Sequence, residues 1–115
     1  MISQNPYEVL RSLGRDYNAE ILAVTSRSLS ADKISENADV PIGTTYRRID
    51  DLVEEGLLEL SGRELSEHSR RQSIYQRTFD SVIVRFEGQS MTLDIEERTE
   101  VQNKLDDICR SLGEH

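Results

Sequence analysis

The stretch that decides the fold runs from Asp39 to Leu58 and reads DVPIGTTYRRIDDLVEEGLL. Pro41 has no amide hydrogen and disfavours helical backbone at Val40, so we expect a tight turn over residues 39–41. A helix over about residues 42–55 follows, because its apolar positions recur at helical spacing. One side of this helix, which we expect to pack inward, collects Ile42, Thr45, Ile49, Leu52, Val53 and Gly56.

The opposite side of the same helix is expected to face solvent. It collects Gly43, Thr44, Arg47, Asp50, Asp51 and Glu54. The exposed side is therefore basic and hydroxylic in its first half and acidic in its second half.

A second, shorter helix is predicted immediately before the turn. Ser30 can cap it, and Leu29 and Ile34 have the spacing of a hydrophobic staple, which predicts a helix over about Ala31 to Asn37. Two short helices with a tight turn between them form the helix-turn-helix pattern. In that motif the N-terminal turns of the second helix enter the major groove of DNA.

Two further helices are predicted near the start of the chain. Asn5 can cap the first, Pro6 suits its first position, and Gly14 ends it. We expect its apolar stripe to consist of Tyr7, Leu10 and Leu13. The second helix is predicted from about Asp16 to Arg27, with Ile21, Leu22 and Val24 in the core.

The second half of the chain alternates like β-strands. Strands are predicted at Leu57 to Leu60 and Ser73 to Phe79, joined by about a dozen polar residues, and then at Val82 to Phe86 and Met91 to Ile95 around Gly88. From Glu97 or Thr99 to Leu112 the helical spacing returns, with the apolar stripe Val101, Leu105, Ile108 and Leu112. The predicted fold class is α+β: a winged helix-turn-helix of about five helices, with a wing hairpin and a second C-terminal β-hairpin. We expect residues 1–79 to form the winged part, and residues 80–115, a hairpin and a dimerisation helix, to pack with it as one unit.

Specific side chains are candidates for contact with DNA. Arg47 can place its guanidinium fork on a guanine edge, and Thr44 and Tyr46 beside the exposed Gly43 can bond phosphate or base. Tyr46 also borders the packed side, so a place in the core is the alternative. Arg48 lies toward the edge of the helix-turn-helix motif, which favours a phosphate contact or an ion pair over base readout.

The predicted wing, about residues 61–77, adds positive charge to an acidic chain. Residues 68–77 hold His68, Arg70, Arg71 and Arg77 and no acidic residue. Local positive charge of this kind is expected of a surface that follows phosphates. The alternative is that Arg70 and Arg71 pair with Glu64 and Glu67 on a solvated loop.

The segment VPIGTTYRRI with LVEEGLL resembles the recognition helix and wing entry of ArsR-like winged-helix regulators. With GRELSEHSRRQSIYQRTFDSVIVRF and a C-terminal helix, the resemblance to small haloarchaeal members covers nearly the whole chain. It implies a DNA-binding transcription regulator. Family-type metal sensing uses paired Cys or His ligands, which this chain does not have at the corresponding helices.

Composition narrows the class of protein further. The chain has 115 residues, 22 Asp and Glu against 14 Lys and Arg, and a net charge of −8, and only Lys33 and Lys104 among its basic residues are Lys. This balance is typical of halophilic proteins, although an ordinary acidic domain also fits it. Without an apolar run of about 18 residues, a soluble cytoplasmic protein is expected. Cys109, His68 and His115 are too few for a disulfide or a structural zinc, so we predict no metal and no cofactor.

The leading functional hypothesis is a sequence-specific regulator that binds double-stranded DNA as a homodimer. The stripe Val101, Leu105, Ile108 and Leu112 would form the dimer seam, or would instead lie against Tyr7, Leu10 and Leu13 of its own chain. An enzyme is not expected, because no nucleophile with a paired base and no glycine-rich phosphate loop is present. The rival hypotheses are a protein-interaction module that does not bind DNA, and a regulator with an effector pocket in the second hairpin, Val82 to Ile95.

Overall fold

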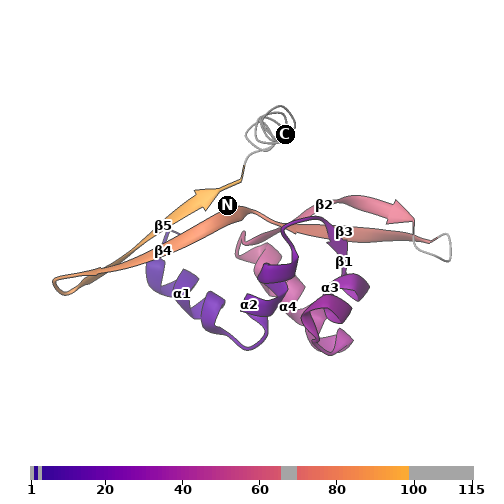
Figure 1. Cartoon of the computed structure of the whole chain (residues 1–115), viewed down its shortest axis with the longest axis horizontal. Coiled ribbons are helices and arrows are strands. Elements are labelled where there is room, and N and C mark those ends of the chain that lie inside the picture. Colours follow the sequence, from indigo (N-terminus) through magenta and orange to yellow (C-terminus); the bar gives the residue numbers. More distant parts are fainter. Residues whose placement is uncertain (1, 3, 66–69, 99–115) are drawn as a thin grey trace, which may run out of the picture.

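The computed structural model describes residue 2, residues 4–65 and residues 70–98. These residues form a mixed α+β fold of four helices and two small antiparallel sheets (Figure 1). The helices are α1 (Pro6–Gly14), α2 (Asn18–Val24), α3 (Ala31–Ala38) and α4 (Ile42–Glu54). The first sheet has the order β1 (Leu29–Ser30), β3 (Arg71–Arg77), β2 (Leu58–Leu65), and the second pairs β4 (Phe79–Glu87) with β5 (Ser90–Glu97).

The helices lie on one side of the two sheets, and the two hairpins extend in opposite directions from the middle of the molecule (Figure 1). We call β2–β3 the first hairpin and β4–β5 the second hairpin. Among the described residues, none of the helices has the length and apolar character needed to cross a membrane.

Helix starts follow the capping signals in the sequence. The Asn5 side chain accepts a hydrogen bond from the Tyr7 amide at 3.0 Å, and Ser30 Oγ accepts one from the Lys33 amide at 3.3 Å. Each cap satisfies an amide that has no partner inside the helix. The predicted starts of α1 and α3 are confirmed, and α1 ends at Gly14 as predicted.

The second helix is shorter than the predicted Asp16 to Arg27. Tyr17 has left-handed backbone, with φ of 72°, so α2 begins only at Asn18. At the other end, Thr25 Oγ1 donates to the carbonyl oxygens of Ile21 and Leu22 at 3.0 and 3.2 Å. The Thr25 amide donates to the Leu22 carbonyl oxygen, three residues back, so the last turn tightens and α2 ends at Val24.

The described residues cover only part of the apolar stripe predicted on α1. Leu13 packs against the core, but Tyr7 and Leu10 are exposed, while Val9 and Ser12 are buried. Strand β5 packs beside the Val9 side of the helix. Helical periodicity alone could not predict which distant segment would lie there.

The core-facing side of α4 is narrower than predicted. Thr45, Ile49 and Leu52 are at most 1% exposed, as expected, but Ile42 and Val53 are 44% and 37% exposed. Ile42 is the first residue of α4 and lies outside the buried stretch of the helix, which runs from Thr45 to Leu52. Val53 lies at the rim of the buried stripe, so only part of the predicted face is covered.

The first sheet differs from the predicted hairpin in two ways. The strand β1 was not predicted: Leu29 pairs with Tyr75 and Ser30 with Ile74, and two residues are too short to show alternation. The strands β2 and β3 are longer at their outer ends than predicted, so the segment between them is shorter than a dozen residues. A register shift between Leu60 and Gly62 marks a bulge in β2.

The second hairpin is confirmed and turns at Gly88, which has φ of 58°, but both strands are longer than predicted. Phe79, predicted as the end of the preceding strand, is the first residue of β4. One hydrophobic core connects the helices with both sheets, because Phe79 is buried in it and Val82 and Leu93 pack against it. The boundary predicted between the winged part and the C-terminal part, at residues 79 and 80, therefore falls just after the first residue of β4. The hydrophobic core continues across it.

Candidate nucleic-acid interface

The turn between α3 and α4 holds the two helices at a defined angle. Asp39 has left-handed backbone with φ of 57°, and Val40 is buried. The Val40 amide donates to the Ser35 carbonyl oxygen at 3.1 Å, and Ser35 Oγ donates back to the Val40 carbonyl oxygen. Thr45 Oγ1 donates to the Pro41 carbonyl oxygen at 3.0 Å. These bonds tie the start of α4 to the end of α3, and the predicted tight turn is confirmed.

The first turn of α4 is open to solvent. Pro41 at the cap provides no side-chain hydrogen bond, and the first turn contains no acidic residue. Gly43 is exposed, and a Cβ added there would meet nothing within 4 Å. The amides of a first helical turn have no acceptor inside the helix, and the positive end of the helix dipole adds to their preference for anions.

The side chains of Thr44 and Arg47 contact each other one helical turn apart. Arg47 Nη2 donates to Thr44 Oγ1 at 3.3 Å, and Arg47 is exposed. Tyr46, for which a core position was the alternative, is 53% exposed. The first half of α4 thus presents a guanidinium and two hydroxyl groups to solvent.

Arg48 belongs to a different set of contacts. Its Nε donates to the Asp16 carbonyl oxygen at 3.1 Å, and its Nη1 lies 3.7 Å from Asp51 Oδ2. Arg15 Nη1 reaches the same Asp51 oxygen at 3.4 Å. Of the two alternatives for Arg48, the structure shows the ion pair, and the pair braces α4 against the segment between α1 and α2.

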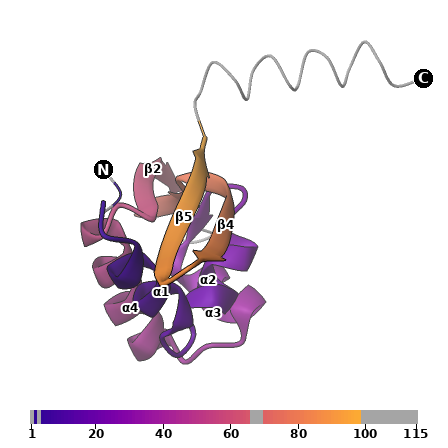
Figure 2. The same cartoon turned by 90° about the vertical axis from the view of Figure 1, so that its left-hand side faces the viewer.

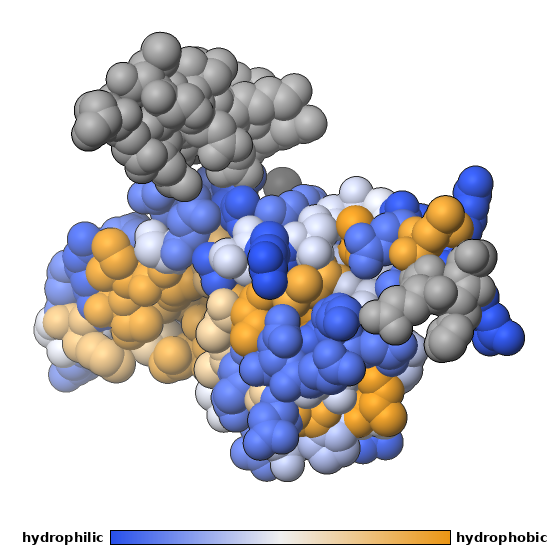
Figure 3. All heavy atoms as spheres, turned by 45° about the vertical axis from the view of Figure 1, so that its right-hand side comes forward, coloured by the Kyte–Doolittle hydropathy of each residue, from blue (hydrophilic) through white to orange (hydrophobic). Residues whose placement is uncertain are grey.

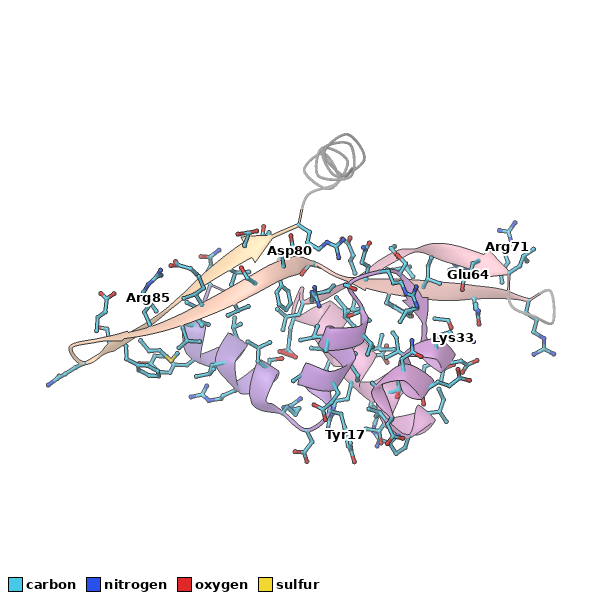
Figure 4. All side chains as sticks on the ribbon, in the orientation of Figure 1. Tyr17, Lys33, Glu64, Arg71, Asp80 and Arg85 are labelled. Carbon is cyan, nitrogen blue, oxygen red and sulfur yellow. The ribbon has the colours of Figure 1, made fainter. Side chains whose placement is uncertain are left out.

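The first hairpin separates its charges onto two faces. Directly opposed residues share a face, so Arg63 opposite Ser73 and Arg71 opposite Leu65 lie on one face, and Glu64 opposite Gln72 lies on the other. Figure 4 shows Arg71 and Glu64 on the outer half of this hairpin. Arg71 and Glu64 form no ion pair within the described residues. Arg63 was not among the predicted DNA contacts. Period-two alternation places its side chain on the same face of β2 as Leu65, and this pattern could have identified it.

The remaining predicted wing residues are Arg70, His68 and Arg77. Arg70 is exposed at the start of the described segment that leads into β3. His68 lies outside the described residues, as do all four residues of the predicted dimer seam.

Arg77 does not belong to the candidate interface, and its prediction as a DNA contact is corrected. Its Nη1 donates to the Leu22 carbonyl oxygen and its Nε to the Phe79 carbonyl oxygen, both at 2.7 Å. The guanidinium also lies 5.7 Å from the centre of the Phe79 ring. Desolvation, and then the charge of Arg98, lower the pKa of Arg77, although a guanidinium remains protonated at neutral pH. The side chain points inward because Arg77 lies opposite Leu58, on the core face of β3.

A groove lies at the other end of the molecule, between α1 and β5. Its volume is about 390 Å³, and it is lined by Ile2, Gln4, Pro6, Val9, Thr92, Leu93, Ile95 and Glu97. Within residues 4–65 and 70–98, no three His, Cys, Asp or Glu side chains gather closely enough to hold a metal ion.

Comparison of the sequence with protein-family models and with curated proteins finds no match.

Proposed function

We propose that this chain is a winged helix-turn-helix transcription regulator that binds double-stranded DNA as a homodimer. In this proposal α4 enters the major groove and the first hairpin is the wing, on the backbone or in the minor groove. The observation that carries the proposal is the solvent-facing side of the first half of α4, which has no acidic residue in the first turn and presents Arg47 beside Thr44.

Base readout rests on Arg47. A guanidinium fork matches the O6 and N7 acceptors of guanine in the major groove. The hydrogen bond that Arg47 Nη2 donates to Thr44 Oγ1 limits the rotamers of Arg47 before DNA binds, which lowers the entropy lost on contact. Thr44 and Tyr46 supply hydroxyl groups for phosphate or base, and Gly43 allows the backbone amides to approach a phosphate closely.

Phosphate contact rests on the arginines of the first hairpin. Arg63 and Arg71 share one face of the hairpin, whereas the carboxylate of Glu64 points to the other. This separation gives an acidic chain, with a net charge of −8, one locally positive surface.

The second half of α4 limits how the helix can lie in the groove. Asp50 and Glu54 are exposed there, and phosphates repel them. The helix is therefore expected to enter the groove by its N-terminal half, as in other helix-turn-helix proteins. The proposed role is DNA binding and regulation without catalysis, in the cytoplasm.

The test is selection of bound duplexes from a random pool at high potassium chloride, followed by fluorescence anisotropy with the selected site. We expect a two-fold-symmetric motif. Arg47→Ala should lose about 1–3 kcal/mol of discrimination at one base position, and Arg71→Ala should weaken all duplexes equally.

The matched control is Arg85→Ala. It removes the same charge at the opposite end of the molecule from Arg71 (Figure 4), where Arg85 pairs with Asp94. Its affinity for DNA should stay within about twofold of the unmodified chain, because surface changes away from an interface have small effects. A chain that binds no duplex at any salt concentration would instead indicate the protein-interaction module.

A further inference from the structure

The N-terminal end of α4 exposes apolar side chains to solvent. Ile42, which helical spacing assigned to the core, is 44% exposed, and Tyr46 is 53% exposed. Pro41, which precedes the helix, is exposed as well. Figure 2 shows α4 at the margin of the helical layer, and in Figure 3 hydrophobic residues reach the surface of that layer below the first hairpin. The end of α4 that is proposed to meet DNA therefore carries an apolar surface beside its polar one.

Ile42 and Tyr46 lie on the same side of α4, one helical turn apart. Successive residues are about 100° apart around the axis, so these two directions differ by only about 40°, and their side chains are neighbours. Arg47, which contacts Thr44, is about 140° from Ile42. The exposed side of the first two turns therefore has a polar flank with Arg47 and an apolar flank. We call Ile42 and Tyr46 the apolar flank of α4.

The major groove of DNA offers this flank one kind of partner. An aliphatic side chain forms no hydrogen bonds, so Ile42 gains nothing from phosphates or from the donors and acceptors on the base edges. Of the four bases, only thymine presents an apolar group in the major groove, the methyl group on C5. Contact between that methyl group and a half-exposed isoleucine removes apolar surface from water on both molecules.

We propose that the apolar flank of α4 reads the 5-methyl group of a thymine, with Ile42 as the specificity-determining residue. This inference rests on the proposed function, because it assigns a base to a helix that is proposed to enter the major groove. Ile42 and Arg47 are five positions apart, or about 7.5 Å along the helix axis. Base pairs follow one another every 3.4 Å or so, and about two of them span that distance. The thymine should therefore lie within about three base pairs of the guanine that Arg47 contacts.

The other end of α4 provides a matched control. Val53 is an aliphatic residue that is 37% exposed, and it lies about 20° from Ile42 around the helix axis. It is about 16 Å farther along the helix, next to the exposed Glu54. Phosphates repel this acidic half of α4, so Val53 should not reach a base.

The experiment starts from the duplex that selection at high potassium chloride returns, and replaces its thymines one at a time by deoxyuridine. This change removes only the 5-methyl group. Fluorescence anisotropy with the full chain should show about a fourfold loss of affinity at a thymine near the guanine. That factor is the equivalent of about 0.8 kcal/mol for one buried methyl group. Replacement of thymines farther away should leave the affinity unchanged.

Two variants connect the methyl group to its partner on the protein. Ile42→Ala should bind the thymine duplex and the deoxyuridine duplex with nearly equal affinity, because the methyl group has lost its contact. Val53→Ala should keep the full fourfold difference. A fourfold difference that persists in Ile42→Ala would overturn the proposal, as would a selected motif with no thymine within about three base pairs of the guanine.

The deoxyuridine duplexes leave the protein unchanged, so this part of the test does not depend on the folding of a variant. A chain that binds the selected duplex without sensitivity to any thymine methyl group overturns the reading of thymine and leaves the proposed function in place. A chain that binds no duplex overturns both.

Discussion

The guanidinium of Arg77 on β3 donates from Nη1 to the backbone oxygen of Leu22 in α2, across 2.7 Å. A second bond of the same length, from Nε to the Phe79 carbonyl oxygen, holds the other edge of the fork. Arg77 therefore connects the last turn of α2 with the junction of β3 and β4. A basic residue in a predicted wing has become a structural link between the helices and the two sheets.

Arg77→Ala should destabilise the fold by about 2–3 kcal/mol, because it leaves two carbonyl oxygens without their charged donor. Arg77→Lys should recover only part of that loss, since an ammonium group cannot make both bonds of the fork. Urea unfolding monitored by circular dichroism measures both variants. If the Arg77→Ala protein has normal stability but does not bind DNA, Arg77 is a DNA contact after all.

Gly43→Ala should have opposite effects on stability and on DNA binding. The added methyl group meets nothing within 4 Å, so the helix should gain about 0.5–1 kcal/mol from the better propensity of alanine. The same methyl group would stand between the first turn of α4 and a phosphate, and affinity for DNA should fall. Thermal unfolding and anisotropy on one preparation test this, and unchanged affinity would argue against close approach at Gly43.

Asp51→Asn should lower stability by less than about 1 kcal/mol, because its pairs with Arg15 and Arg48 are partly exposed. It should raise DNA affinity, since it removes a negative charge from α4. Asp50→Asn changes the charge equally on the same helix and controls for that effect. If the two variants unfold at the same urea concentration, the brace between α4 and the α1–α2 segment contributes nothing measurable.

The salt dependence of DNA binding should be shallow. Each phosphate contact contributes about −0.9 to the slope of log affinity against log salt, and Arg63 and Arg71, each present twice in a homodimer, supply few contacts. We expect a slope no steeper than about −4, reduced by about 2 in Arg71→Ala because both copies lose the contact. Titrations from low to molar potassium chloride give this slope, and a loss of many decades in affinity would contradict the proposed balance of base and phosphate contacts.

Local signals in the sequence predicted the starts of α1 and α3 and the turn before α4. The caps at Asn5 and Ser30 and the break at Pro41 act through atoms a few residues away. The same locality explains the correct placement of Gly88 in the second hairpin. Arg47 could be predicted as exposed because it lies opposite the Thr45, Ile49 and Leu52 stripe on its own helix.

Only the tertiary structure decided which side of each element is covered. Tyr7 and Leu10 are exposed because β5, which lies far along the chain, packs on the other side of α1. The strand β1 at Leu29 forms because β3 pairs with it. Arg77 points inward because it lies opposite the buried Leu58 of β2. Capping, turns and periodicity are properties of neighbouring residues, and the sequence by itself determined those. Burial and long-range pairing depend on which distant segment arrives, and no local pattern contains that information.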